Sequence, residues 1–240
     1  LLYSIMATSF RFITLIGEWS FAHAVMMGVS SYTCALLALK VGWSFWAAFP
    51  LGILASAFVG LLYGYPAVRT KGMYFFLATW AMGEAVRLCW IRFSDLFGGI
   101  SGIAGIPKPI INLPGLPRVE IVGLPAYYYL VLVFTIISLI IMYRLEKSRV
   151  GLTFKSIAQS DILAQAVGIN LMRFKLLIIV IASAFAGVAG GLLAHYTGYI
   201  NPNTFGLTLA LNIIVFVVVG GVGSPVGPVV GTVIFVLIGE

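Results

Sequence analysis

Two charged side chains within one apolar segment point to polar chemistry inside a membrane. Glu84 and Arg87 lie three positions apart in residues 73–93, so a helix places them on one face, where they can form an ion pair. A charge near the centre of a bilayer costs at least about 2.5–3.5 kcal/mol, so it must face protein or water. We therefore predict that both residues contact a polar solute on a translocation pathway. The alternative is a pair that only fixes how its helix packs.

Two histidines also lie in apolar surroundings. A lone intramembrane histidine either packs between helices or touches a solute, and His23 is a candidate pathway residue on the second interpretation. His195 ends the stripe Ser183, Gly187 and Gly191, whose four-residue spacing is typical of closely packed membrane helices. This stripe predicts a helix interface rather than a reactive group.

Catalysis would need titratable groups gathered at one place. His23, Glu84 and His195 belong to three separate apolar segments, so we do not expect an enzyme. Cys34 and Cys89 form neither a CxxC motif nor a metal-ligand spacing, which favours small core residues. We expect no metal ion and no cofactor.

A glycine-rich break near the end of the chain is the second candidate part of a pathway. Residues 220–228 interrupt an apolar stretch, and irregular backbone at membrane depth is tolerated only where protein buries it or water reaches it. We assign Gly220, Gly221 and Gly223 to the pathway together with Asn212; the alternative is a tight helical hairpin. The break lacks the Gly-Lys-Ser/Thr ending of a nucleotide-binding loop, so any ATP hydrolysis would belong to another polypeptide.

The composition decides the class of protein that positions these residues. Of 240 residues, 61% are hydrophobic and only 9% are charged, and the mean hydropathy is +1.10. A soluble domain has about 25% charged residues, so both a soluble globule and a disordered chain are excluded. We predict an all-α, polytopic transmembrane helical bundle with broken or re-entrant segments.

About eight membrane segments are expected in one transmembrane domain covering residues 1–240. The chain opens without Met and stops inside an apolar stretch, so this number is a lower bound. The expected segments are 2–16, 20–38, 43–65, 73–93, 126–143, 176–195, 207–219 and 229 onward.

Basic residues indicate how the bundle is oriented. Lys and Arg concentrate in 66–72 and 144–175, which we place in the cytoplasm, with 94–125 and 198–206 on the outer side. The formal net charge of +7 arises largely from these loops, so nucleic acid is not an expected partner.

The cytoplasmic loop 144–175 is longer than a connection requires. We predict a helix from about Thr153, as its cap, to Val167, ended by Gly168 in the left-handed conformation. The apolar residues of this helix, spaced four apart, form one stripe. They are Phe154, Ala158, Ile162 and Ala166. Such a helix can lie on the membrane, pack under its own bundle or enter a groove on a partner, and its mild polar face favours a protein partner.

A series of motifs in order along nearly the whole chain resembles the membrane subunit of bacterial branched-chain amino acid ABC importers, of the LivM type. The motifs are Ser20-Phe21-Ala22-His23, Thr70-Lys71-Gly72-Met73-Tyr74-Phe75, Ala81-Met82-Gly83-Glu84-Ala85-Val86-Arg87-Leu88, Gly102-Ile103-Ala104-Gly105-Ile106-Pro107, Ala166-Val167-Gly168-Ile169-Asn170 and Gly220-Gly221-Val222-Gly223-Ser224. The sequence departs from the family in places, with Ser101 for a usual Asn, Ala22 for a common Gly, and added charges at Arg11 and Glu18.

The resemblance implies a multi-pass permease in the bacterial inner membrane that works with a related permease, two cytoplasmic ATP-binding subunits and a periplasmic solute-binding protein. It also implies that the helix of the cytoplasmic loop couples the permease to the ATPase. The coupling residues that the resemblance implies are Gly151, Phe154, Ile157, Asp161, Ala164, Ala166, Gly168 and Asn170.

The function expected is inward transport of branched-chain or related amino acids, with urea or short amides as other solutes carried by close relatives. Two alternatives stay open. A self-contained secondary transporter or channel would use Glu84 for proton coupling, and an intramembrane enzyme would need the clustered groups that the sequence lacks.

Overall fold

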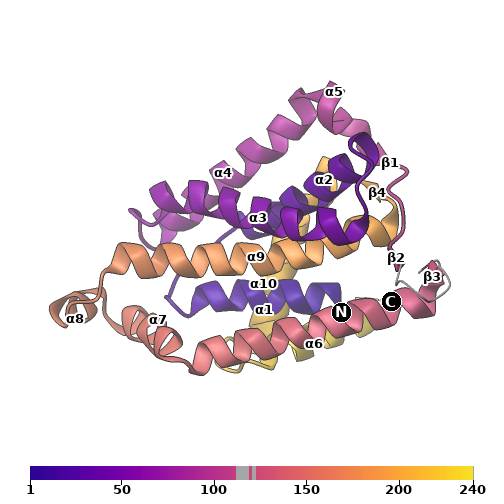
Figure 1. Cartoon of the computed structure of the whole chain (residues 1–240). Coiled ribbons are helices and arrows are strands. Elements are labelled where there is room, and N and C mark those ends of the chain that lie inside the picture. The colour runs from indigo at the N-terminus through magenta and orange to yellow at the C-terminus, as the bar shows by residue number, and fades with distance from the viewer. Residues whose placement is uncertain (112–118, 121–122, 240) are drawn as a thin grey trace.

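The computed structural model describes residues 1–111, 119–120 and 123–239, and these form a bundle of helices with short strands at one end (Figure 1). The elements in chain order are α1 (Leu2–Thr14), α2 (His23–Lys40), α3 (Phe45–Ala67), α4 (Met73–Arg92), α5 (Ser94–Phe97), η1 (Gly99–Ser101), β1 (Ile103–Ala104), β2 (Ile110–Ile111), β3 (Val119–Glu120), α6 (Leu124–Lys147), α7 (Arg149–Gln159), α8 (Asp161–Ala166), α9 (Leu171–Thr197), β4 (Tyr199–Ile200), η2 (Pro202–Phe205), α10 (Leu207–Gly220) and α11 (Gly227–Gly239).

Each of the eight predicted apolar segments is a helix, which confirms the all-α, polytopic fold class. Four stretches of the described residues are long and apolar enough to cross a membrane by length and composition. They are Phe45–Ala67, Leu124–Lys147, Leu171–Thr197 and Pro202–Gly220. The other segments correspond to α1, α2, α4 and α11; α1 and α11 have 13 residues each, and α4 contains three charged side chains.

Helix α9 forms the centre of the bundle, between α3 on one side and α1 on the other (Figure 1). Its small residues allow this close packing. A Cβ atom at Gly190 would lie 1.9 Å from the backbone oxygen of Met27 in α2, and one at Gly187 would lie 2.9 Å from Cβ of Ser56 in α3. The predicted small-residue interface is therefore confirmed.

Serine hydroxyls find hydrogen-bond partners across these close helix contacts. Ser31 of α2 donates to the backbone oxygen of Gly190 at 2.8 Å, and Ser56 of α3 donates to that of Ser183 at 2.7 Å. Hydrogen bonds between helices replace the water that a polar group loses in an apolar interior. They also fix the height of α2 and α3 against α9.

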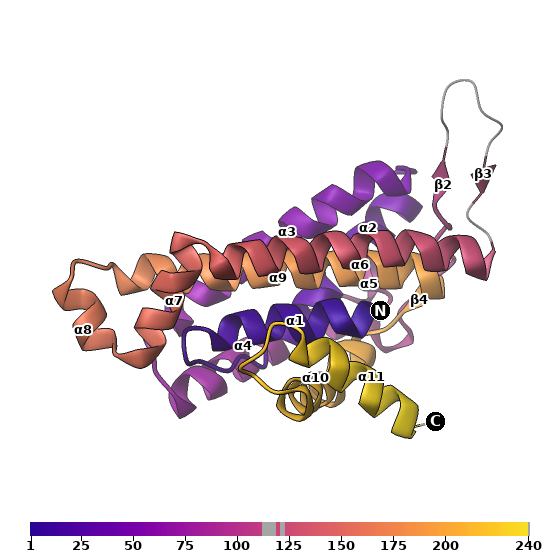
Figure 2. The ribbon, with the colours of Figure 1, turned by 90° about the horizontal axis from the view of Figure 1, so that it is seen from below.

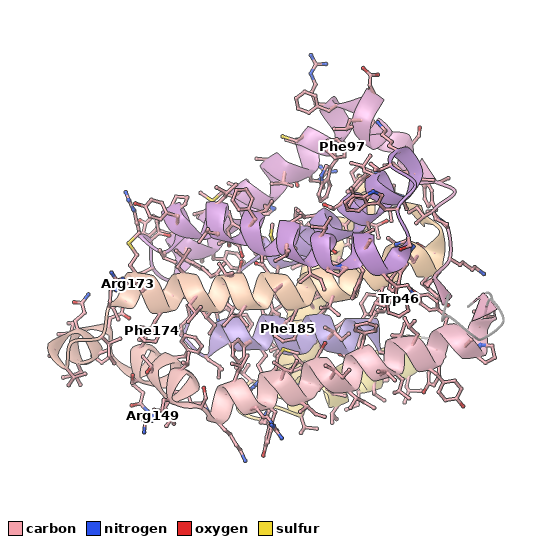
Figure 3. All side chains as sticks on the ribbon, viewed as in Figure 1. Trp46, Phe97, Arg149, Arg173, Phe174 and Phe185 are labelled. Carbon is pink, nitrogen blue, oxygen red and sulfur yellow. The ribbon has the colours of Figure 1, made fainter. Side chains whose placement is uncertain are left out.

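The loops separate into two ends of the bundle, as the distribution of basic residues predicts. At one end β1 pairs with β4, which joins loop 94–125 to loop 198–206. At the other end Lys71 lies 2.5 Å from Asp161, which joins loop 66–72 to loop 144–175. In Figure 3, Trp46 and Phe97 mark the strand end, whereas Arg149, Arg173 and Phe174 mark the α7–α8 end. Residues 112–118 and 121–122 of the predicted outer loop lie outside the described part of the chain.

Helices α10 and α11 form a hairpin that packs beside α1 (Figure 2). Their backbones nearly touch, because a Cβ at Gly220 would lie 1.9 Å from the oxygen of Gly227 and one at Gly231 would lie 2.0 Å from that of Phe216. Gly221, at φ +87°, begins the turn that joins the two helices.

Candidate functional site

The α7–α8 end of the bundle gathers most of the ionic contacts of the described residues. Helix α7 turns sharply away from α6, and Gly151 permits that turn, because a Cβ there would lie 2.2 Å from the backbone oxygen of Glu146. The hydroxyl of Ser148 accepts a hydrogen bond from the Gly151 amide at 3.4 Å and so caps α7. Two clusters of charged side chains then attach α7 and α8 to the bundle.

The first cluster joins α1, α6 and α7. Arg11 Nη1 lies 2.6 Å from Glu146 Oε2, and Arg11 Nη2 lies 3.0 Å from Oε1, so the guanidinium binds both carboxylate oxygens. Lys155 of α7 lies 2.9 Å from the same carboxylate. The side chains of Arg11 and Glu146 expose only 2% and 6% of their surface, so the pair is shielded from water. Arg11 Nε also donates to the backbone oxygen of Val222, in the α10–α11 link, at 2.7 Å.

The second cluster joins α8 and α9 to two loops. Lys175 Nζ lies 3.3 Å from Asp161 Oδ2 and 3.5 Å from Glu18 Oε1. Lys71 lies 2.5 Å from the same oxygen of Asp161, and the Gly72 amide donates to Glu18 Oε2 at 3.1 Å. Lys175 of α9 therefore holds both the start of α8 and the turn between α1 and α2. The loop between α3 and α4 contacts the same two carboxylates.

The pKa values of the two carboxyls in this second cluster move in opposite directions. Burial raises the pKa of Glu18, and the charge of Lys175 only partly offsets that effect. Burial also raises the pKa of Asp161, but the hydrogen bond from Lys71 and the charge of Lys175 outweigh it, so this pKa lies below its ordinary value.

The helix predicted within residues 144–175 is present but divided. It begins at Arg149 with Ser148 as its cap, so the prediction of Thr153 as the cap is wrong; Thr153 instead donates to the Arg149 backbone oxygen at 3.0 Å. The backbone breaks at Ser160, whose hydroxyl caps α8 by accepting from the Leu163 amide at 3.3 Å. The left-handed conformation predicted for Gly168 is confirmed, at φ +85°.

The predicted single apolar stripe is also wrong. Phe154 is buried whereas Ala158, Ile162 and Ala166 are exposed. Ala158 belongs to the same helix as Phe154, so the stripe already ends within α7. Ile162 and Ala166 follow the break at Ser160, which changes the phase of the helix. Phe154 packs edge-on between Phe12 of α1 and Phe174 of α9, with ring centroids 5.9 and 6.3 Å away.

The expected coupling residues divide into a buried and an exposed group. Gly151, Phe154, Ile157 and Ala164 are buried and attach the element to the bundle; Asp161 is partly buried in the second cluster. Ala166, Gly168 and Asn170 are exposed, and the side chain of Asn170 caps α9 by accepting from the Arg173 amide at 3.1 Å. Four large apolar side chains remain uncovered on α7, α8 and the turn after them. They are Leu152, Ile162, Leu163 and Val167, all exposed by more than 60%.

The candidate pathway residues lie at separate places in the bundle. His23 is buried between α2 and α1, where its Nε2 lies 2.8 Å from Ser9 Oγ. Glu84 forms the predicted ion pair with Arg87, and Arg87 Nη1 donates to Asn203 Oδ1 of η2 at 3.0 Å. Gly83 packs on Ala22, beside His23, whereas the side chain of Glu84 remains 36% exposed.

The glycine break lies at the charged end of the bundle, next to Arg11. Gly220 and Gly221 are half-buried in the α10–α11 turn and Gly223 is exposed, while Asn212 is half-buried within α10. The structure therefore does not bring the break together with His23 or with the Glu84–Arg87 pair. Among the described residues, no group of three His, Cys, Asp or Glu side chains could hold a metal ion.

The two ion clusters contain residues that the sequence analysis did not assign to the site. The missed residues are Arg11, Glu18, Lys71, Glu146, Lys155 and Lys175. The sequence does show Arg11 and Glu18 as two charges in an apolar region. Their partners could not be found, because Glu146 is 135 positions from Arg11 and no local spacing connects them.

Comparison with known proteins shows the family to which the chain belongs. A family model described as the branched-chain amino acid transport system permease component matches residues 1–240. The chain is 30% identical over 230 residues to the high-affinity branched-chain amino acid transport permease LivM of Salmonella typhimurium, and 29% identical to LivM of Escherichia coli. These matches cover 87% of this chain and 53% of each relative, so the chain spans about half of their length.

A second group of relatives is related more distantly. The permease LivH of Salmonella typhimurium is 27% identical over 253 residues, which cover 95% of this chain and 78% of LivH. No solved structure matches the chain. The family match extends over the whole chain, and each of the eight apolar segments expected from the sequence is a helix. This multi-pass membrane protein therefore belongs to the family of permease components of branched-chain amino acid transport systems.

Proposed function

We propose that this chain is the membrane-spanning permease subunit of a binding-protein-dependent ABC importer, that it moves branched-chain or related amino acids inward across the bacterial inner membrane, and that partner subunits hydrolyse the ATP. Membership of the permease family carries this proposal. The chain itself acts as a gate and not as an enzyme. The relatives support an importer rather than a self-contained secondary transporter.

The α7–α8 element is the proposed contact with the ATP-binding subunits. It presents Leu152, Ile162, Leu163 and Val167 to the surroundings at the end of the bundle where Arg149 and Arg173 also lie (Figure 3). Burial of such an exposed apolar patch in a groove on a soluble protein is more favourable than its exposure to water, and the basic residues beside it can contact the rim of that groove. Its buried face and the two ion clusters would transmit the motion of such a partner into the bundle.

The exposed face of α4 is the proposed contact with a second permease. Leu77, Trp80, Glu84 and Leu88 follow each other at three- and four-residue steps, and all four are at least partly exposed. A half-exposed ion pair near the middle of a membrane helix is costly against lipid. A related permease that packs on this face would cover the pair, or would leave it beside an aqueous pathway between the two subunits.

At the opposite end, the outer loops joined by β1 and β4 are the proposed docking surface for the solute-binding protein. The pairing of Ile103 with Ile200 makes the two loops one unit. Tyr199 strengthens it by donating from its hydroxyl to the backbone oxygen of Ser101 at 2.8 Å.

The test is reconstitution of the chain with the transport proteins encoded beside it. Ile162→Asp places a charge in the exposed α7–α8 patch, and we expect it to abolish copurification of the ATP-binding subunits and ATP-driven uptake. The matched control is Ile100→Asp at the strand end, because Ile100 is also strongly exposed, at 67%. This control should retain the ATP-binding subunits. Concentrative uptake by the chain without any ATP-binding subunit would overturn the proposal.

A further inference from the structure

One side chain links the coupling end of the molecule to the glycine break. Arg11 uses two nitrogens of its guanidinium for Glu146 and the third, Nε, for the backbone oxygen of Val222. Glu146 lies in the last turn of α6, and Val222 lies in the α10–α11 link. A guanidinium can make these contacts at once because its donors form a rigid planar fork, which the single ammonium of a lysine does not offer.

The contact continues to the α7–α8 element. Lys155 of α7 lies 2.9 Å from Glu146 Oε1, the same oxygen that Arg11 Nη2 binds. A displacement of α7 would therefore pull on Glu146, then on Arg11 and then on the α10–α11 link. The chain of contacts runs from an exposed element to a backbone carbonyl through a pair of charges that are almost fully buried.

A cavity beside the ion pair leaves room for such a displacement. Its volume is about 350 Å³, and it is lined by Met142 and Tyr143 of α6 on one side and by Pro225 and Val226 of the link on the other. Arg11 and Glu146 form part of its wall. Because close-packed interiors resist small shifts, a hollow between α6 and the link makes this contact easier to deform than the closely packed helices around it.

The link joins two helix ends that are closely packed on each other. The close approach of Gly220 to Gly227 holds the ends of α10 and α11 together. Gly221 is in the left-handed region, and a Cβ atom there would meet no other atom within 4 Å. A pull on Val222 therefore acts on the turn of a tightly packed hairpin, and α11 would follow α10.

We propose that Arg11 is a positioning residue that passes the displacement of α7–α8 to the α10–α11 hairpin. The proposal rests on the proposed function, since it assumes that ATP-binding subunits move α7–α8. This role differs in one respect from that of an ion pair that only stabilises the fold. The hydrogen bond from Arg11 to Val222 is needed to pass on the displacement of α7–α8, whereas the ion pair with Glu146 is enough for folding.

Two variants separate these roles in the complete transport complex in proteoliposomes. Arg11→Lys keeps a positive charge for Glu146 but cannot serve the carboxylate and Val222 together. The double variant Arg11→Met with Glu146→Met removes both charges, and replacing both members of a buried pair by apolar residues is often neutral for stability. Arg92→Lys, at the exposed end of α4, is the control.

We expect both altered complexes to retain the ATP-binding subunits, their basal ATP hydrolysis and the KM for ATP. The stimulation of kcat by the loaded binding protein should fall to the unstimulated level, and Arg92→Lys should keep the full stimulation. Full stimulation in Arg11→Lys would overturn the proposal. The proposal would also be overturned if assembly, basal ATP hydrolysis and the melting temperature all fell together with the stimulation. A pair that serves only to hold the fold predicts that result. If the unaltered complex shows no stimulation, the proposed function fails instead.

Discussion

The ammonium of Lys175 lies 3.3 Å from the carboxylate of Asp161, so the start of α9 holds the first residue of α8. Lys175 also faces Glu18 at 3.5 Å, and its side chain is only 5% exposed. A single buried cation thus attaches α8 and the α1–α2 turn to the central helix. Two carboxylates depend on it, and of these two Asp161 has a second lysine, Lys71, beside it.

Replacing Lys175 by Met should destabilise the protein strongly. Removal of one partner from a buried ion pair leaves the other charge uncompensated and typically costs about 3–5 kcal/mol. Lys147→Met is the control, since Lys147 is exposed and contacts the ring of Tyr143, an interaction worth about 0.5–1 kcal/mol. Thermal unfolding in detergent measures both. Equal melting temperatures for the two variants would contradict the role given to Lys175.

The stability due to Asp161 should persist in mild acid. The pKa of Asp161 in the folded protein lies below its ordinary value. At any pH above the ordinary value, the charged carboxylate therefore stabilises the folded protein. This stability is lost as the pH falls through the pKa of the folded protein. We expect Asp161→Asn to lower the melting temperature equally from pH 8 to about pH 5, and the difference to close below about pH 4.

Glu18→Gln should show the opposite pH dependence. Burial holds the pKa of Glu18 above its ordinary value, so its protonated form favours folding at low pH and that contribution is lost as the pH rises through the folded pKa. The unaltered protein should therefore lose stability relative to Glu18→Gln as the pH rises above the ordinary value of 4.5. Parallel curves for Asp161→Asn and Glu18→Gln would show that the cluster does not distinguish the two carboxyls.

The glycines of the α10–α11 break should not be equivalent. An added Cβ at Gly220 would overlap the backbone of Gly227, whereas one at Gly223 would meet no atom within 4 Å. Gly220→Ala should therefore lower the melting temperature and disturb the hairpin, and Gly223→Ala should leave the melting temperature unchanged. If Gly223→Ala nevertheless reduces uptake, its role is in transport. Normal stability in Gly220→Ala would contradict the close contact.

Glu84→Gln tests whether the ion pair of α4 belongs to the pathway. The substitution keeps the shape and a hydrogen-bond acceptor for Arg87 but removes the charge. We expect solute uptake to fall while the ATP-binding subunits remain bound, measured across pH 6 to about 8. Uptake that stays normal at every pH would show that the pair only positions α4, and Arg87→Lys should then also be neutral.

The sequence predicts the helices of this protein well because lipid imposes simple requirements. Long apolar runs had to be helices, and breaks such as that at Gly220 had to end them. The spacing of Ser183, Gly187 and Gly191 correctly predicts a close interface, since a helix always brings such residues onto one face. Local pattern and final structure agree for the long apolar segments, whereas the local caps at Ser148 and Ser160 were not predicted.

The α7–α8 element is less predictable, because part of its packing depends on distant partners. Ser160 interrupts a run that the sequence presents as one helix, and the phase of Ile162 and Ala166 changes with it. Glu146 is recognisable only as another charge near the end of a segment until α1 places Arg11 against it. The site therefore follows from packing between distant segments, while the fold follows mostly from composition and periodicity.

The distance between Arg11 and Glu146 along the chain has a consequence for biosynthesis. Ribosomes add about 5–20 residues per second, so the 135 positions between them correspond to roughly 7–27 seconds of synthesis. During that interval the arginine has been made and its carboxylate does not yet exist. Helix α1 can therefore reach the packing described above only after α6 has been made.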